Sequence, residues 1–489
     1  MEKEGKIVVD IRSIVTRLPE LRFSAPVSWR IEEGQQWAVI GPIGAGKTLI
    51  ADIMQRKFAF KDGEVVFSGD GKVSDFIKSI AFKDIYSLAD CRNSYYQQRW
   101  HSTETDEVPT VEELLGEYQG SEDLKEILTL FGIEDLLPKR LIFLSSGELR
   151  KFLIVRTLLS RPRILILDNP FIGLDAPSRE LLVGMLGQMT RMKGVQVVLL
   201  LSNPADIPAM ITHVLPVHDR TCLAPMSREA FLGNHELIAR LFPTEGLLAD
   251  ENIDCQLPVE ADKEPSTHEV TLRMEQVRIR YGSRTILKDL DWEIKNGEKW
   301  ALFGPNGAGK STLLSLVYAD NPQSYANTLY LFDRKRGSGE SIWDIKKRIG
   351  YVSPEMHLYY KENVPAVNIV GSGFFDSIGL FRKCNDEQAA VALEWMKVFG
   401  IEHLKDRLFL TLSSGEQRLV LLARAFVKDP DLIILDEPLH GLDVSSKKKA
   451  ARIIERFCDR PGKTLIYVTH YPHELPACVD KRFQLVKHA

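Results

Sequence analysis

Two stretches of this chain decide its fold: Gly41-Pro-Ile-Gly-Ala-Gly-Lys-Thr48 and Gly304-Pro-Asn-Gly-Ala-Gly-Lys-Ser311. Both fit the pattern of a phosphate-binding loop, in which glycines let backbone N–H groups and a helix N-terminus face an anion. Each follows a short apolar run, Trp37–Ile40 in the first case and Trp300–Phe303 in the second. Such runs are typical of buried parallel strands. We therefore expect two nucleoside triphosphate sites.

The lysine and the hydroxyl residue of each loop have distinct expected roles. Lys47 and Lys310 should reach the β- and γ-phosphates, while the hydroxyls of Thr48 and Ser311 should bind Mg²⁺. ATP and Mg²⁺ are thus the expected ligands. The predicted nucleotide contacts in the two loops are Gly41, Gly44, Gly46, Lys47 and Thr48, and Gly304, Gly307, Gly309, Lys310, Ser311 and Thr312.

The composition is that of an ordinary soluble globular protein, with 489 residues, 44% hydrophobic and 27% charged. A net charge of −4 argues against nucleic acid binding through an extended basic surface. No apolar run reaches 18 residues, and the start of the chain lacks an apolar signal region, so we expect no membrane span and no secretion. The six cysteines include no C-x-x-C pair, which argues against a zinc site and favours the reducing cytoplasm.

The second half of the chain repeats the first. Gly41 and Gly304 are 263 positions apart, while Leu144-Ser-Ser-Gly-Glu148 and Leu412-Ser-Ser-Gly-Glu416 are 268 apart. The drift of five residues predicts one net insertion between phosphate loop and second motif, where a variable helical subdomain would lie. We expect a domain at 1–245, an acidic linker at 246–269 and a second domain at 270–489.

Four further apolar runs read as central parallel strands, and two of them end in an acidic residue at the edge where α/β sheets bind ligands. These two end at Asp168 and Asp436, and the others are Val195–Leu201 and Thr464–Thr469.

The order of these motifs resembles the ATP-binding cassette (ABC) ATPases, present here as a tandem pair, over nearly the whole chain outside the linker. The stretches Arg336–Val352 and Phe374–Gly379 are also similar to the ModF-type double cassettes, a group named for molybdate transport and photorepair. The resemblance implies an α/β fold with two P-loop nucleotide-binding domains, each a RecA-like core with a helical subdomain.

In this family each nucleotide lies between two cassettes, with the phosphate loop of one facing the signature motif of the other, head to tail. The resemblance implies that site A joins Gly41–Thr48 and Asp168 to the signature residues Ser413, Ser414, Gly415 and Glu416. It implies that site B joins Gly304–Ser311 and Asp436 to Ser145, Ser146, Gly147 and Glu148. Asp168 and Asp436 are further implied Mg²⁺ ligands.

Only site B carries the residues with which the family hydrolyses ATP. Glu437 is implied to polarise the attacking water and His470 to contact the γ-phosphate, whereas the first half has Asn169 and Asn203 at these places. An amide can hold water but cannot accept its proton. We therefore expect hydrolysis mainly at site B, with Glu437, His470, Asp436 and Lys310 as catalytic residues.

The same asymmetry extends to the adenine contact. Tyr281 is implied to stack on the base at site B, whereas the position 263 residues earlier is Leu18.

Two functions remain open. One is the ATP-binding subunit of a transport system, with molybdate as a candidate cargo, located in the cytoplasm or held peripherally on the inner face of the membrane by separate membrane-spanning subunits. The other is a soluble mechanochemical ATPase that acts on ribosomes or nucleic acid. The short acidic linker and the single catalytic glutamate favour transport, because ribosome-acting double cassettes carry a long basic linker and two glutamates.

Overall fold

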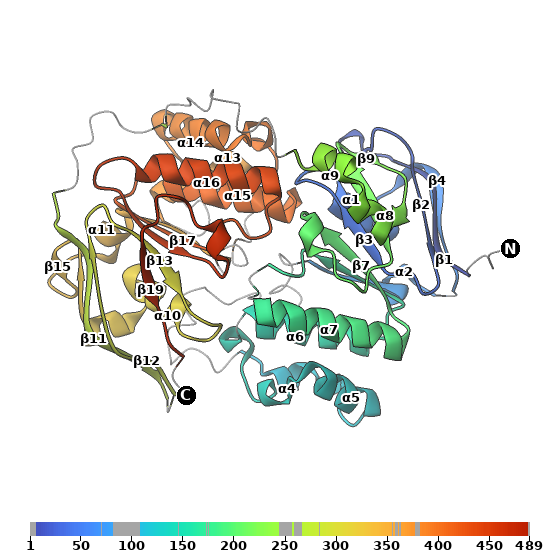
Figure 1. The fold of residues 1–489 in the computed structure, drawn as a ribbon, viewed down its shortest axis with the longest axis horizontal. Coiled ribbons are helices and arrows are strands. Elements are labelled where there is room, and N and C mark those ends of the chain that lie inside the picture. The colour runs from blue at the N-terminus through green and yellow to red at the C-terminus, as the bar shows by residue number, and fades with distance from the viewer. Residues whose placement is uncertain are drawn as a thin grey trace. The chain divides into compact units, whose positions relative to one another are not determined.

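The computed structural model describes residues 6–69, 71–81, 108–144, 146–172, 174, 176–243, 257–258, 267–282, 284–354, 356, 360, 363–376 and 382–487. The chain forms two compact units, built mainly of residues 1–250 and 251–489. Each unit contains one mainly parallel sheet and one antiparallel sheet, as drawn in Figure 1. No helix in the described ranges is both long and apolar enough to cross a bilayer.

The strands of the first half are β1 (Ile7–Thr16), β2 (Val27–Glu32), β3 (Trp37–Ile40), β4 (Phe60–Phe67), β5 (Ile77–Ala81), β6 (Ile164–Asp168), β7 (Gln196–Leu201), β8 (His213–His218), β9 (Thr221–Cys222) and β10 (Met226–Ser227). Its α-helices are α1 (Lys47–Met54), α2 (Val73–Phe76), α4 (Val111–Leu114), α5 (Glu122–Phe131), α6 (Ser146–Leu159), α7 (Ala176–Lys193), α8 (Arg228–Gly233) and α9 (His235–Leu241).

The strands of the second half are β11 (Val270–Tyr281), β12 (Arg284–Lys295), β13 (Lys299–Phe303), β14 (Thr328–Leu331), β15 (Arg334–Lys335), β16 (Ile349–Val352), β17 (Leu432–Asp436), β18 (Thr464–Val468) and β19 (Lys481–Gln484). Its α-helices are α10 (Lys310–Val317), α11 (Ile342–Lys346), α13 (Ala366–Gly371), α14 (Asp386–Phe399), α15 (Ser414–Phe426) and α16 (Val444–Cys458).

The two central sheets share one topology. Their parallel strands run in the order β5-β6-β7-β3-β8 in the first half and β16-β17-β18-β13-β19 in the second. Every residue of β3, β6, β7, β17 and β18 is buried, as their continuous apolar sequences predict. The first half adds β9 and β10, which pair antiparallel with β8. The predicted duplication of an α/β domain is confirmed.

Strand register refines the predicted insertion. Ile77 of β5 pairs with Ile164, and Ile349 of β16 pairs with Leu432, so the matching strands are 272 positions apart. The offset between the halves is 263 at the phosphate loops, 272 at this strand and 268 at the signature motifs. The net insertion of five residues predicted from sequence therefore consists of nine extra residues in the second half before this strand and four fewer after it. The gain coincides with β15, which pairs with β14.

The repeated Phe-Gly-Ile-Glu sequence marks the end of a helix in each half. α5 ends at Gly132 (φ 55°) and α14 ends at Gly400 (φ 75°), both in the left-handed conformation that terminates helices. The starts also correspond, because Ser121 and Asn385 each accept a hydrogen bond from an N–H of the first turn. Figure 1 shows α13, α14 and α15 packed together, apart from β11 and β12.

The end of the predicted linker belongs to the folded second unit. His268 is buried, and its Nε2 lies 2.9 Å from the Thr271 hydroxyl while its Nδ1 lies 3.0 Å from Arg348. Its ring meets Phe332 edge to face. Burial and the neighbouring guanidinium lower the pKa of His268. The sequence did not predict that His268 is buried, because a single histidine in the acidic stretch 246–269 gives no periodic pattern.

Candidate functional site

The phosphate loop of the first half begins where β3 ends. Gly41 leaves the sheet at its carboxyl edge, and a Cβ there would lie 2.0 Å from the carbonyl oxygen of Val217. Gly44 and Gly46 have φ angles of 78° and 106°, in the left-handed region that favours glycine. The loop can curl in this way only because glycine occupies these positions.

The second phosphate loop repeats this geometry. Gly307 and Gly309 have φ angles of 79° and 96°, and Gly304 follows β13 directly. Ser311 and Thr312 lie in the first turn of α10. Both predicted loops therefore have the backbone shape that the sequence pattern requires.

Each loop lysine folds back onto its own loop. Lys47 Nζ donates to the carbonyl oxygens of Gly41 and Pro42, at 2.8 Å each. Lys310 Nζ donates to the carbonyl oxygen of Gly304 at 2.6 Å. Both ammonium groups thus lie within the curve that would cradle phosphates.

The residues of the first half fit a bound Mg²⁺ ion. Thr48 Oγ1 donates to Asp168 Oδ2 across 3.1 Å, which brings a hydroxyl of α1 and a carboxylate at the end of β6 to one point. Oxygen donors of this kind suit Mg²⁺. In the second half, the same strand order places Asp436 at the end of β17 and Ser311 at the start of α10. Among the described residues, no cluster of three or more His, Cys, Asp or Glu side chains could hold a metal ion, so each proposed Mg²⁺ site has one carboxylate and one hydroxyl.

The backbone after the acidic strand is the same in both halves. Asn169 and Glu437 each have φ of 49°. Their N–H groups donate to Leu200 (3.0 Å) and Val468 (2.9 Å), respectively, each on the neighbouring strand. Asparagine tolerates this left-handed conformation, whereas glutamate is strained in it, and such strain is typical of functional sites. The halves therefore differ here in side chain alone.

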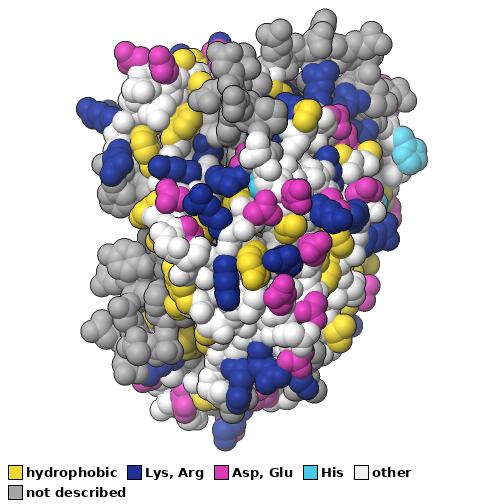
Figure 2. Space-filling view, turned by 90° about the vertical axis from the view of Figure 1, so that its left-hand side faces the viewer, with side chains coloured by type: hydrophobic (Ala, Val, Ile, Leu, Met, Phe, Trp, Pro, Cys, Tyr) yellow, Lys and Arg dark blue, Asp and Glu magenta, His cyan; other side chains and the backbone are white. Residues whose placement is uncertain are grey.

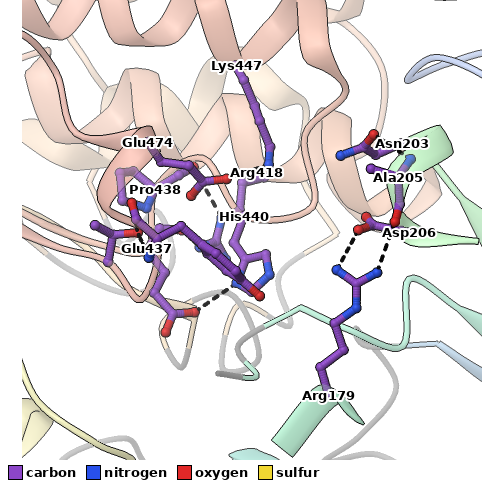
Figure 3. Close-up of polar contacts among 12 residues, drawn as sticks. Arg179, Asn203, Ala205, Asp206, Arg418, Glu437, Pro438, His440, Lys447 and Glu474 are labelled. Atoms are coloured by element: carbon purple, nitrogen blue, oxygen red, sulfur yellow. Dashed lines mark hydrogen bonds and ion pairs between the residues drawn. The ribbon is translucent and has the colours of Figure 1, made fainter. Parts of the chain in front are cut away.

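The carboxylate of Glu437 is held by two imidazoles. His440 Nδ1 lies 3.1 Å from Oε2 (Figure 3), and His470 Nε2 lies 3.1 Å from Oε1. The Glu437 side chain is only 9% exposed. Burial opposes its ionisation, but the hydrogen bonds from His440 and His470 outweigh that effect and hold the pKa of Glu437 well below its usual value. Glu437 is therefore ionised at neutral pH.

A buried arginine fixes the main chain beside this carboxylate. Arg418 of α15 donates through Nη2 to the carbonyl oxygen of Glu437. Its counterpart in α6, Arg150, donates through Nη2 to the carbonyl oxygen of Ile172 at 2.6 Å. Burial lowers the pKa of Arg418. In each half, the helix that follows the signature motif is thus tied to the loop after the acidic strand.

In the first half, the side chains that match Glu437 and His470 form hydrogen bonds with neighbouring residues of the chain. Asn169 Nδ2 donates to Asp168 Oδ1 at 2.9 Å. Asn203 Oδ1 accepts from the N–H of Ala205 at 3.1 Å, which caps a short 3₁₀ helix. Figure 3 also shows Asp206 of this helix paired with Arg179. The first half offers no carboxylate at the place of Glu437 and no imidazole at the place of His470.

In the signature motif of the second half, the glutamate forms hydrogen bonds with the serine that begins the helix. Ser413 caps α15, and Glu416 Oε2 accepts hydrogen bonds of 2.7 Å from both the N–H and the hydroxyl of Ser413. Ser414 and Gly415 follow in the first turn, and the Ser414 side chain is buried. Glu416 therefore acts as a helix cap in this structure.

The signature of the first half is described in part. Ser145 lies outside the described residues. Ser146, Gly147 and Glu148 form the first turn of α6, and Glu148 accepts from Lys139 Nζ at 2.9 Å.

The adenine contacts differ between the halves. Tyr281 ends β11, and its hydroxyl accepts from Asn321 Nδ2 at 3.0 Å. Leu18 is 48% exposed. An aromatic ring nevertheless reaches the first phosphate loop, because Phe23 lies 3.0 Å from the place of a Cβ on Gly46. Sequence comparison missed Phe23, which stands where the second half has an isoleucine.

His440 was also missed from the sequence. The matching residue of the first half is Ile172, so a comparison of the two halves alone could have found it. The second half has a histidine three residues after Glu437, where the first half has an isoleucine three residues after Asn169.

Residues 25–172 and 287–440 each match the family described as ABC transporter. The chain is 36% identical to the ABC transporter ATP-binding protein ModF of Escherichia coli (strain K12), covering 96% of this chain and 93% of that protein. It is 32% identical to an uncharacterized ABC transporter ATP-binding protein of Schizosaccharomyces pombe, covering 93% of each.

Among solved structures, the complex of an archaeal ribosome recycling factor with a ribosomal stalk protein contains a similar fold. The TM-score is 0.51 at 18% identity, covering 96% of this chain and 87% of that chain. At this identity the likeness concerns the fold alone.

Proposed function

Because the chain belongs to the ABC transporter ATP-binding family, we propose that it binds ATP at two sites and hydrolyses it mainly at site B. As a member of this family the chain is an ATPase. The observation that carries the proposal is the contrast between Glu437, held by two histidines, and Asn169, whose amide donates to Asp168.

Hydrolysis at site B needs a base beside the attacking water. Glu437 accepts a proton as the water oxygen attacks the γ-phosphorus and the bond to the ADP oxygen breaks. Its low pKa keeps the carboxylate ionised, so its oxygens can accept a hydrogen bond from the attacking water. Lys310 and His470 stabilise the negative charge on the phosphoryl oxygens. Ser311 and Asp436 would hold Mg²⁺, which would supply neutralisation of the phosphate charge.

Site A is proposed to bind ATP without rapid turnover. Lys47, Thr48 and Asp168 retain the arrangement for phosphate and Mg²⁺. In the head-to-tail arrangement proposed from the family, each site is completed by the signature of the other half. ATP retained at site A would stabilise the closed pair while site B cycles, since a ligand that binds only the closed state shifts the population toward it.

Lys47→Ala is expected to lower ATP turnover although Lys47 belongs to site A. Its loss removes a phosphate contact and weakens closure of the two halves. The measurements are steady-state phosphate release and nucleotide stoichiometry in a Glu437→Gln background. We expect two ATP per chain with Lys47 and one without it. Lys57→Ala, just beyond the opposite end of α1 and paired with Asp52, is the control. One ATP per chain in both backgrounds, with normal turnover of Lys47→Ala, would exclude this role.

The role of the ATPase cycle is proposed to be transport. The family and the similarity to ModF support an ATP-binding subunit that drives separate membrane-spanning subunits, with molybdate as the candidate cargo. Action on ribosomes or nucleic acid is the alternative. On the face drawn in Figure 2, Lys and Arg side chains are interspersed with Asp and Glu and do not form one basic surface. This face therefore lacks the clustered cations on which nucleic acid binding depends.

Capture of partners by the ATP-trapped protein tests this choice. Glu437→Gln protein loaded with MgATP should retain integral membrane proteins in detergent, and wild-type protein with ADP should not. Recovery of ribosomal subunits or nucleic acid in place of membrane proteins would reverse the assignment.

A further inference from the structure

Glu437 has a separate partner for each carboxylate oxygen. His470, after β18, contacts Oε1, and His440, three residues beyond Glu437 in the same loop, contacts Oε2. Figure 3 shows the His440 ring turned toward Glu437. For His440 to donate to the carboxylate, its Nδ1 must carry the proton.

The two histidines are not equivalent. His470 reaches Glu437 through Nε2, and the family resemblance implies that the same side chain contacts the γ-phosphate. An imidazole that turns to the phosphate gives up part of its contact with the carboxylate, so ATP binding weakens the hold of His470 on Glu437. His440 belongs to the loop that carries Glu437, and its ring packs edge to face on Tyr471, with 5.7 Å between centroids. It can therefore keep its bond while His470 turns to the nucleotide.

We propose that His440 is a positioning residue for hydrolysis: it holds Oε2 of Glu437 so that Oε1 faces the attacking water when ATP is bound. The proposal rests on the proposed role of Glu437 as the base. The first half carries Ile172 at this position and lacks the glutamate as well, so the positioning group and the base are present together or absent together.

Two substitutions distinguish the effect of the His440 hydrogen bond on turnover from the effect of the packing of its side chain. His440→Ile installs the residue that the other half accommodates at 5% exposure, and it removes the donor. His440→Asn keeps an N–H donor close to the place of Nδ1. We expect His440→Ile to lower kcat by about tenfold to a hundredfold with little change in KM for ATP, as misplacement of a catalytic group does. His440→Asn should recover most of the lost turnover. His473→Gln, an exposed histidine nearby, is the control.

Epistasis with Glu437 completes the test. In the Glu437→Gln background, His440→Ile should cause no further loss of turnover, because a positioning residue acts only through the group it positions. Any of three results would overturn the proposal. The first is a wild-type kcat in His440→Ile, and the second is an equal loss of kcat in His440→Asn and His440→Ile. The third is that His440→Ile lowers kcat by the same factor in the Glu437→Gln background as in the wild-type background. If His440→Ile fails to fold, His440→Leu, which also lacks a donor, replaces it in both backgrounds with the same expected losses. High turnover in Glu437→Gln alone would instead refute the proposed function.

Discussion

Glu437→Gln is expected to abolish steady-state ATP turnover in the full-length protein while ATP binding persists. The amide retains the size of the carboxylate but cannot accept a proton, and loss of general-base action lowers rates by about 10²–10⁴-fold. Phosphate release and nucleotide binding are the two measurements. The effect should be this large because Asn169 gives site A no base to compensate.

The matched control lies at the same backbone position in the first half. Asn169→Ala removes an amide that donates to Asp168 and is expected to leave turnover within about twofold, since an amide supplies no base. A Glu437→Gln protein that kept more than about a tenth of wild-type turnover would contradict the assignment of hydrolysis to site B.

The second large effect is expected from a residue far along the chain from Glu437. Gly147→Asp in the first signature should lower turnover by about a hundredfold, because it places a carboxylate where site B needs a γ-phosphate contact. Among the described residues, a Cβ at Gly147 would come within 4 Å of Leu174 alone, at 3.4 Å, an ordinary van der Waals contact. Gly415→Asp alters the signature assigned to site A and should cost less.

Mixing experiments decide whether these sites form within one chain. Gly147→Asp and Glu437→Gln proteins are each expected to be inactive, and an equimolar mixture should stay inactive if each chain closes on itself. Recovered activity in the mixture would show instead that the two halves of different chains complete one another.

The sequence predicted the parts of the site that depend on short-range pattern. The phosphate loops follow from glycine spacing, and the strands that end at Asp168 and Asp436 follow from continuous apolar runs, because burial on both faces demands them. Of the two histidine partners of Glu437, only His470 was predicted. His470 matched a family position, whereas His440 matched none. The contact of Phe23 with its loop depends on how the antiparallel sheet meets α1, which no local pattern encodes.

The arginine shared by α6 and α15 bears on the history of the chain. Both arginines donate to a carbonyl oxygen of the loop after the acidic strand, Arg418 to that of Glu437 and Arg150 to that of Ile172, the residue that matches His440. The simplest account is that a single ancestral cassette already carried this arginine when the gene duplicated. The hydrolytic side chains differ between copies within the same backbone frame, so their divergence came later. The shared arginine therefore dates from before the duplication, whereas the difference between Asn169 and Glu437 dates from after it.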